Sequence, residues 1–121
     1  MEFYADIPAG KLINNQLQDI LLISNLQNLC RSINTVIEDN QSSAEIYCLW
    51  GHFKINREVL TEGVRFSLPE CPNALAWSIT QHQTTLTLHL TINKKYHDAD
   101  FIDSINTFMD DWVIGLHTLT L

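Results

Sequence analysis

The densest group of side chains that could bind a metal or transfer protons is His97, Asp98, Asp100 and Asp103. Imidazole and carboxylate groups can do both kinds of chemistry. The same aspartates, however, lie just before and within the first turn of a predicted helix, where carboxylates accept hydrogen bonds from free main-chain N–H groups. Their spacing also lacks the glycine turn and the distal glutamate of a calcium-binding loop. We therefore predict that Asp98 or Asp100 caps the helix, and that the protein binds no metal and no cofactor.

The other histidines and the three cysteines are too scattered to predict a catalytic or metal site. No His-x-x-x-His pair lies on a predicted helix, and the sequence has no Cys-x-x-Cys pair. We expect Cys30 and Cys48 in the core, and Cys71, in a proline-containing loop, to be the cysteine that reaches solvent. A reactive thiolate would need a neighbouring histidine or helix N-terminus, which the sequence around Cys71 does not offer. An enzyme that uses His89 or His97 with nearby carboxylates is therefore the least favoured of three functional hypotheses.

The composition is that of a single globular domain over residues 1–121, with 45% hydrophobic and 17% charged residues. No run approaches the ~18 uncharged apolar residues that cross a membrane. The first residues lack the basic and apolar segments of a signal peptide, so we expect a cytoplasmic protein. Seven Lys and Arg against 14 Asp and Glu give a net charge of -7. This charge repels phosphate backbones and anionic lipids, which argues against nucleic acid and membrane partners.

Two neighbouring segments near the C-terminus show the strongest hydrophobic periodicity. Apolar residues at 86, 88, 90 and 92 alternate with polar ones, which predicts a strand with one buried face. Between Phe101 and Leu116, apolar residues recur at spacings of three, four and seven, which predict one amphipathic helix. We expect this helix to cover the strand. A loop over 93–98 joins the two segments, and Gly115 would end the helix as its C-terminal cap.

The earlier segments predict further strands and one more helix. We expect an edge strand at 2–5, a short buried strand at 17–23, and a helix from Ser24 to about residue 37 that begins with a Ser-x-x-Gln capping box. Residues 44–57 have the pattern of one strand whose apolar face changes parity, which a bulge at Gly51 would explain. Strands follow at 64–68 and 74–80. The last two strands should form a hairpin with Trp77 opposite Leu88, because this register brings apolar faces together.

These elements predict an α+β fold with the order strand, helix, four strands, helix (β-α-β4-α), in which an antiparallel sheet carries two helices on one face. This order resembles that of the TATA-binding-protein-like and helix-grip superfamilies. Members of the first bind DNA through a basic sheet, which this acidic chain does not have. Members of the second often enclose apolar ligands between the sheet and the long helix, so the resemblance implies a binding cavity at that place.

The preferred functional hypothesis concerns the sheet face opposite the helices. The residues expected there are small and nearly uncharged, with Ala76, Ser78, Thr87 and His89 among them. Such a face allows another chain to approach closely. A solvated, threonine-rich surface is the alternative, since threonine favours strands in any case. We therefore expect a non-enzymatic interaction protein that forms a homo-oligomer, most simply a homodimer, or that binds a protein partner.

The second hypothesis is a small-molecule binding domain with an apolar cavity between the sheet and the C-terminal helix. Trp77, Leu88, Phe108 and Trp112 would line this cavity. Trp77 and Trp112 also fit the predicted core, so packing alone would explain them. Trp50 lies beside the predicted bulge, which leaves its facing ambiguous, and an exposed anchor is one interpretation of it.

Overall fold

The structure is a computed structural model that describes residues 1–13, 16–93 and 97–120. In this part of the chain, one antiparallel sheet of seven strands has the order β1-β7-β6-β5-β4-β3-β2. The strands are β1 (Glu2–Pro8), β2 (Ile33–Ile37), β3 (Ser43–Cys48), β4 (Gly51–Leu60), β5 (Gly63–Ser67), β6 (Ala76–His82) and β7 (Thr85–Thr91). The predicted α+β class with an antiparallel sheet is confirmed. The predicted β-α-β4-α order is wrong, because the sheet contains more strands than expected.

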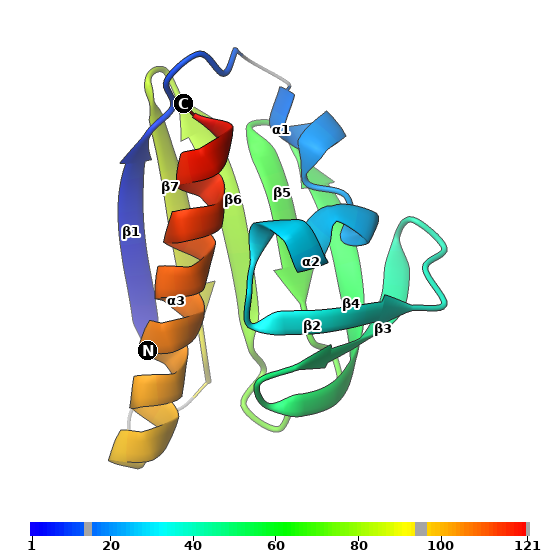
Figure 1. Cartoon of the computed structure of the whole chain (residues 1–121). Helices are drawn as coiled ribbons and strands as arrows, with labels where there is room; N and C mark the ends of the chain where they lie inside the picture. The colour runs from blue at the N-terminus through cyan, green and yellow to red at the C-terminus, as the bar shows by residue number, and fades with distance from the viewer. Residues whose placement is uncertain (14–15, 94–96, 121) are drawn as a thin grey trace.

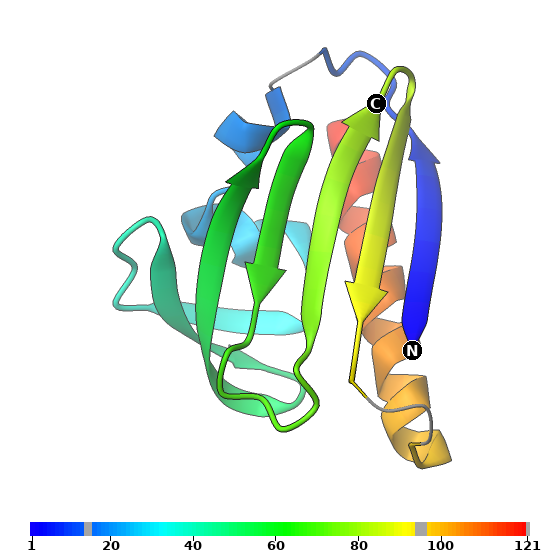
Figure 2. The same ribbon diagram turned by 180° about the vertical axis from the view of Figure 1, so that it is seen from behind.

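The helical segments are α1 (Gln16–Ile20), the 3-10 turn η1 (Ile23–Asn25), α2 (Leu26–Leu29) and α3 (Ala99–Leu119). Figures 1 and 2 show all of them on the same side of the sheet. The long helix α3 packs on β1 and on α2, and α1 packs on β5 and β6. The sheet curls, so that β2 and β3 run across the direction of β6 and β7 and partly enclose α2 (Figure 1).

The start of α3 follows the prediction, whereas its end does not. Asp98 is the N-cap residue, and its Oδ1 accepts a hydrogen bond from the Phe101 N–H at 2.8 Å. Gly115 is not a C-terminal cap, because α3 continues to Leu119. A Cβ on Gly115 would lie 1.6 Å from the Leu29 carbonyl oxygen, so glycine is needed here for the close approach of α2. Among the described helices, none is both long and apolar enough to cross a membrane.

The core lies between the helices and the inner face of the sheet, and it contains the residues of the strongest periodicity. Leu86, Leu88 and Leu90 of β7 are fully buried. They face the apolar stripe of α3, in which Phe108 and Trp112 are also buried. At about 25 cal/mol per Å² of apolar surface removed from water, such burial is the main stabilising contribution to the fold.

Residues 17–37 fold differently from the prediction. The expected strand at 17–23 is instead α1 and η1, and the expected helix from Ser24 ends at Leu29. Residues 33–37 form the edge strand β2, because Ile33, Thr35, Val36 and Ile37 are β-branched and favour extended backbone. The Gln27 side chain does not complete a capping box. Its Oε1 accepts from the Val36 N–H at 3.1 Å, which ties the helical segment to β2.

The parity change in residues 44–57 comes from a hairpin and not from a bulge. Strand β3 ends at Cys48, β4 begins at Gly51, and these two residues pair across a two-residue turn. Ile46 therefore pairs with Phe53, so that even positions of β3 lie opposite odd positions of β4. The predicted single strand is in fact two strands. Gly51 has φ +114, a conformation that favours glycine at the end of such a turn.

The hairpin of β6 and β7 has the predicted buried face but a different register. Trp77 lies opposite Leu90, and Ile79 lies opposite Leu88, so the predicted pairing of Trp77 with Leu88 is wrong by two residues. The strand continues to His82 because the polar Gln81 takes an inward position opposite Leu86. Its amide donates to the Leu12 carbonyl oxygen at 2.9 Å, which allows a polar side chain to be buried there. A shift of two residues keeps every side chain on its predicted face.

Candidate functional site

The four residues predicted to line a cavity are brought together, and they pack against one another. All four are at most 1% exposed. The Trp77 ring meets the Phe108 ring edge-on at 4.9 Å and lies 6.3 Å from the Trp112 ring. Leu88 lies on the same inner face of the sheet. These side chains therefore fill the space between the sheet and α3, and any opening must be sought at its ends.

An apolar pocket of about 230 Å³ opens at one end of this core. Three segments that are far apart in the sequence form it: the β3–β4 turn, the β5–β6 loop and the first turn of α3. We call it the mouth pocket, and its lining residues are Trp50, Phe53, Leu68, Cys71, Pro72, Asn73, Leu75 and Phe101. Most of this lining is apolar, and within the described residues it includes no carboxylate and no imidazole. The mouth pocket can therefore offer apolar contact, but it does not offer acid–base chemistry.

Trp50 connects the mouth pocket to the aromatic core. Its indole Nε1–H donates to the Ser104 Oγ at 2.8 Å, and the Ser104 hydroxyl donates to the Phe101 carbonyl oxygen at 2.5 Å. The Trp50 ring lies 4.8 Å from the Phe108 ring, and Phe108 in turn contacts Trp77. Trp50 is thus partly buried and held against α3. The interpretation of Trp50 as an exposed anchor is wrong, because the hairpin turn directs its side chain toward the helix.

Two indole N–H groups in the core lack a hydrogen-bond acceptor among the described residues. They belong to Trp77 and Trp112, both of which are buried from solvent. A buried donor without an acceptor costs about 1–3 kcal/mol relative to a satisfied one. The inner end of the aromatic cluster is therefore able to donate hydrogen bonds to a molecule that reaches it, whereas the N–H of Trp50 is already used.

The three cysteines are distributed as predicted. Cys30 and Cys48 are buried, and Cys71, in the lining of the mouth pocket, is partly exposed. Burial raises the pKa of the Cys30 thiol to about 12 and also raises the pKa of Cys48. Both buried thiols therefore stay protonated near neutral pH, which suppresses their reactivity. Cys71 is a natural chemical probe of the mouth pocket.

The group of His97, Asp98, Asp100 and Asp103 lies at the start of α3, where one aspartate caps the helix as predicted. Asp98 caps α3, while Asp100 and Asp103 are exposed in the first turns. The His97 ring packs on the Phe101 ring at 5.0 Å. Within the described residues, no three His, Cys, Asp or Glu side chains are grouped closely enough to hold a metal ion.

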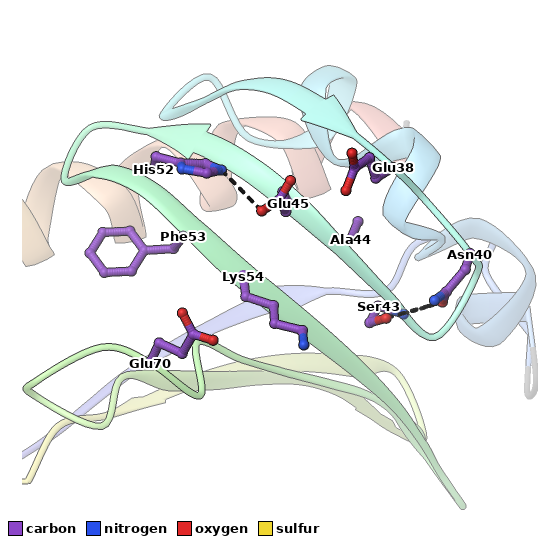
Figure 3. A pocket seen from close by; sticks show the side chains of 9 residues that line it. All are labelled: Glu38, Asn40, Ser43, Ala44, Glu45, His52, Phe53, Lys54 and Glu70. Carbon is purple, nitrogen blue, oxygen red and sulfur yellow. Dashed lines mark hydrogen bonds and ion pairs between the residues drawn. The ribbon is translucent and has the colours of Figure 1, made fainter.

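Two larger hollows among the described residues are lined by charged and polar side chains, which in the second are joined by the apolar Leu22 and Ile23. One, of about 390 Å³, lies beside β3 and β4, and its lining includes Lys54 and the three glutamates Glu38, Glu45 and Glu70 (Figure 3). His52 Nε2 lies 3.5 Å from the Glu45 carboxylate at its edge. The other, of about 490 Å³, lies between η1 and the β2–β3 loop. Its Arg57 is already engaged, because the guanidinium donates to the main-chain oxygens of Gln18 and Leu21 at 2.7 Å.

The residues predicted for an interface alternate along β6 and β7 with residues of the core cluster, so they lie on the opposite face of the sheet, which we call the outer face. Figure 2 views the sheet from the side that faces away from the helices. Ser78, Thr87 and His89 are partly exposed. Ala76 is buried but does not belong to the core cluster. Together with Arg65 and Thr91, several of these residues line a shallow hollow of about 220 Å³.

Strand β1 adds charged and aromatic residues to the outer face that the sequence interpretation did not include. His89 stacks on Tyr4 at 4.3 Å, and its Nε2 lies 3.0 Å from the Glu2 carboxylate. The Thr87 hydroxyl donates to Asp6 Oδ1 at 2.8 Å. The alternation of residues 2–6 was the only signal that could have placed Glu2, Tyr4 and Asp6 on one face.

Compared with known proteins, the sequence matches no family model and no curated protein.

Proposed function

We propose that this protein is a non-catalytic binding module, and that its mouth pocket takes a small, largely apolar molecule. The observation that carries the proposal is the apolar hollow of about 230 Å³ between Trp50, Leu75 and Phe101, at the open end of the space enclosed by the sheet and α3. Small-molecule sites are typically concave and mostly apolar, with few polar groups. The lining of this hollow has that character.

The arrangement of the elements supports the same proposal. One strand precedes the short helices, six strands follow them, and one long helix ends the chain. This arrangement resembles the helix-grip folds, in which an apolar ligand often lies between the sheet and the long helix. The likeness is one of topology alone, and fold does not determine function. The proposal therefore rests on the pocket, and the topology is consistent with it.

The size of the pocket sets the expected affinity. A ligand that buries about 150 Å² of apolar surface there gains about 4 kcal/mol at about 25 cal/mol per Å². Part of this gain is offset by the loss of translational and rotational freedom on binding, so a dissociation constant of about 1 mM or weaker is expected from apolar contact alone. Tighter binding requires a polar contact as well, and the buried N–H groups of Trp77 and Trp112, which lack an acceptor among the described residues, would supply one to a molecule that reaches them. The preferred ligand class is therefore a compact aromatic or alicyclic molecule with one hydrogen-bond acceptor.

Titration with benzyl alcohol, followed by amide chemical shifts, tests the proposal. We expect saturable shifts at Trp50, Cys71, Leu75 and Phe101, and none at Ser78 on the outer face. Two variants at one position provide the control. Cys71→Ser keeps the pocket open and should bind as the wild type does, whereas Cys71→Phe places a ring in the pocket and should abolish the shifts. Equal binding by C71F and C71S would contradict the proposal.

The prediction of an interface on the outer face concerns the opposite side of the sheet. It stays a prediction, and it depends neither on the mouth pocket nor on its ligand. The two surfaces can therefore be tested independently, because no residue belongs to both the mouth pocket and the hollow of the outer face.

A further inference from the structure

The strand pairing arranges the outer face in rows of side chains that cross the sheet. Tyr4 pairs with His89, His89 with Ser78, and Ser78 with Arg65, so these four residues form one row across β1, β7, β6 and β5. Residues two positions apart on a strand point to the same face. Glu2 and Asp6 therefore flank Tyr4 on β1 at about 7 Å on either side.

Charge is distributed unevenly along this row. Both acids lie on β1, at one edge of the sheet, and Arg65 lies exposed on β5. Between them, β7 and β6 present Thr87, Ser78 and Ala76, which are small and uncharged. The acidic strand and the basic residue are equally far from the line between β6 and β7. The outer face is thus self-complementary about that line.

We propose that two copies of this chain associate through their outer faces, about a two-fold axis that runs along the strands between β6 and β7. This axis places β1 of one copy on β5 of the other. Arg65 of the partner subunit then lies over the Tyr4 ring, with the Glu2 and Asp6 carboxylates on either side. Cation–π and charge-assisted contacts both favour this placement.

The other simple symmetry is unfavourable. A two-fold axis perpendicular to the strands would place β1 on β1 of the partner and would oppose the acids to each other. Repulsion between the carboxylates of the two β1 strands disfavours this arrangement. Glu58, which pairs with Arg65 on β4, falls outside the proposed overlap, because the partner ends at its own β1. The small residues of β6 and β7 let the two sheets approach to about 10 Å.

The overlap is modest, which sets the strength of the dimer. The overlap consists of three strands of seven residues and one of five, which together cover about 410 Å² of projected area. A standard interface buries about 800 Å² on each partner. We therefore expect a dissociation constant of about 10–100 µM. The charge of -7 on each copy also opposes association, but repulsion between distant exposed groups is screened beyond about 8 Å at physiological salt.

Sedimentation velocity on the full chain, from about 5 to 500 µM at physiological salt, tests the proposal. Wild-type protein should dimerise over this range. Arg65→Glu should weaken the dimer at least tenfold. Lys54→Glu is the matched control, because it makes the same change in net charge on the exposed side of β4, outside the overlap. It should weaken the dimer no more than about threefold.

A mixing experiment tests the axis itself. Asp6→Arg and Arg65→Glu should each self-associate poorly, because positions 6 and 65 then carry like charges at both contacts of each homodimer. Mixed in equal amounts, they should form a heterodimer, because positions 6 and 65 then carry opposite charges at both contacts while Glu2 is unchanged. Thermal unfolding confirms that both variants fold. A wild-type protein that stays monomeric at the highest concentration overturns the proposal, as does equal weakening by R65E and K54E or the absence of the mixed dimer.

Discussion

The contact between Trp50 and Ser104 holds the β3–β4 turn against α3. A double-mutant cycle can measure how much this contact contributes to the unfolding free energy. Trp50→Phe keeps an aromatic ring against Phe108 but removes the N–H that donates to Ser104 at 2.8 Å. A neutral hydrogen bond of this kind contributes about 0.5–1.5 kcal/mol. Ser104→Ala removes the acceptor and also the bond to the Phe101 carbonyl oxygen, although alanine partly compensates through its helix propensity. We expect each single variant to lose about 1 kcal/mol of unfolding free energy.

Urea unfolding followed by far-ultraviolet circular dichroism measures all four proteins of the cycle. The double variant should be less destabilised than the sum of the two single variants, with a coupling free energy of about 1 kcal/mol. The matched control combines Trp50→Phe with Thr107→Ala, an exposed position on the same helix, and should be additive. A coupling below about 0.3 kcal/mol for Trp50 and Ser104 would show that the turn does not contact α3 as described.

Two further predictions concern the packing of the helices and the buried thiol. Gly115→Ala should lower the unfolding free energy by about 2–4 kcal/mol, because its Cβ would meet the Leu29 carbonyl oxygen, and thermal melts should show little effect of the exposed control Ile114→Ala. The pKa of Cys30 is raised by burial from its ordinary value near 9 to about 12, so unfolding releases a proton above pH 9 and stability should fall as the pH rises toward 12. Between pH 9 and pH 10.5, the unfolding free energy measured in urea should decrease by about 1–2 kcal/mol less in Cys30→Ala than in the wild type. An identical decrease in both proteins would contradict the buried state of Cys30.

The sequence predicted best those elements whose periodicity is unbroken. The alternation of Leu86, Leu88 and Leu90 and the apolar stripe of α3 identified the inner face of the sheet and the helix that covers it. The helix start was also predictable, because Asp98 is a strong capping residue at a position that needs an acceptor. The register of the hairpin was not predictable in this way, since a slip of two residues leaves all faces unchanged and the polar Gln81 conceals the inward end of β6.

Residues 17–37 were misassigned because local signals disagreed there. The spacing of Leu26, Leu29 and Ile33 fits a helix, while the β-branched run after Ile33 fits a strand, and pairing with β3 decides in favour of the strand. The mouth pocket could not be predicted from the sequence for a different reason. Its walls come from three segments separated by many residues, and no local pattern places Trp50, Leu75 and Phe101 side by side. Only the topology of the sheet brings them together.

If the mouth pocket binds a compact apolar molecule, the position of that molecule can be measured directly. Crystals soaked with a bromobenzyl alcohol and measured at the bromine absorption edge would show the halogen as an anomalous difference peak. We predict a peak between Trp50, Leu75 and Phe101, which disappears in C71F and persists in C71S. A peak found elsewhere on the molecule, or no difference between the two variants, would contradict this prediction.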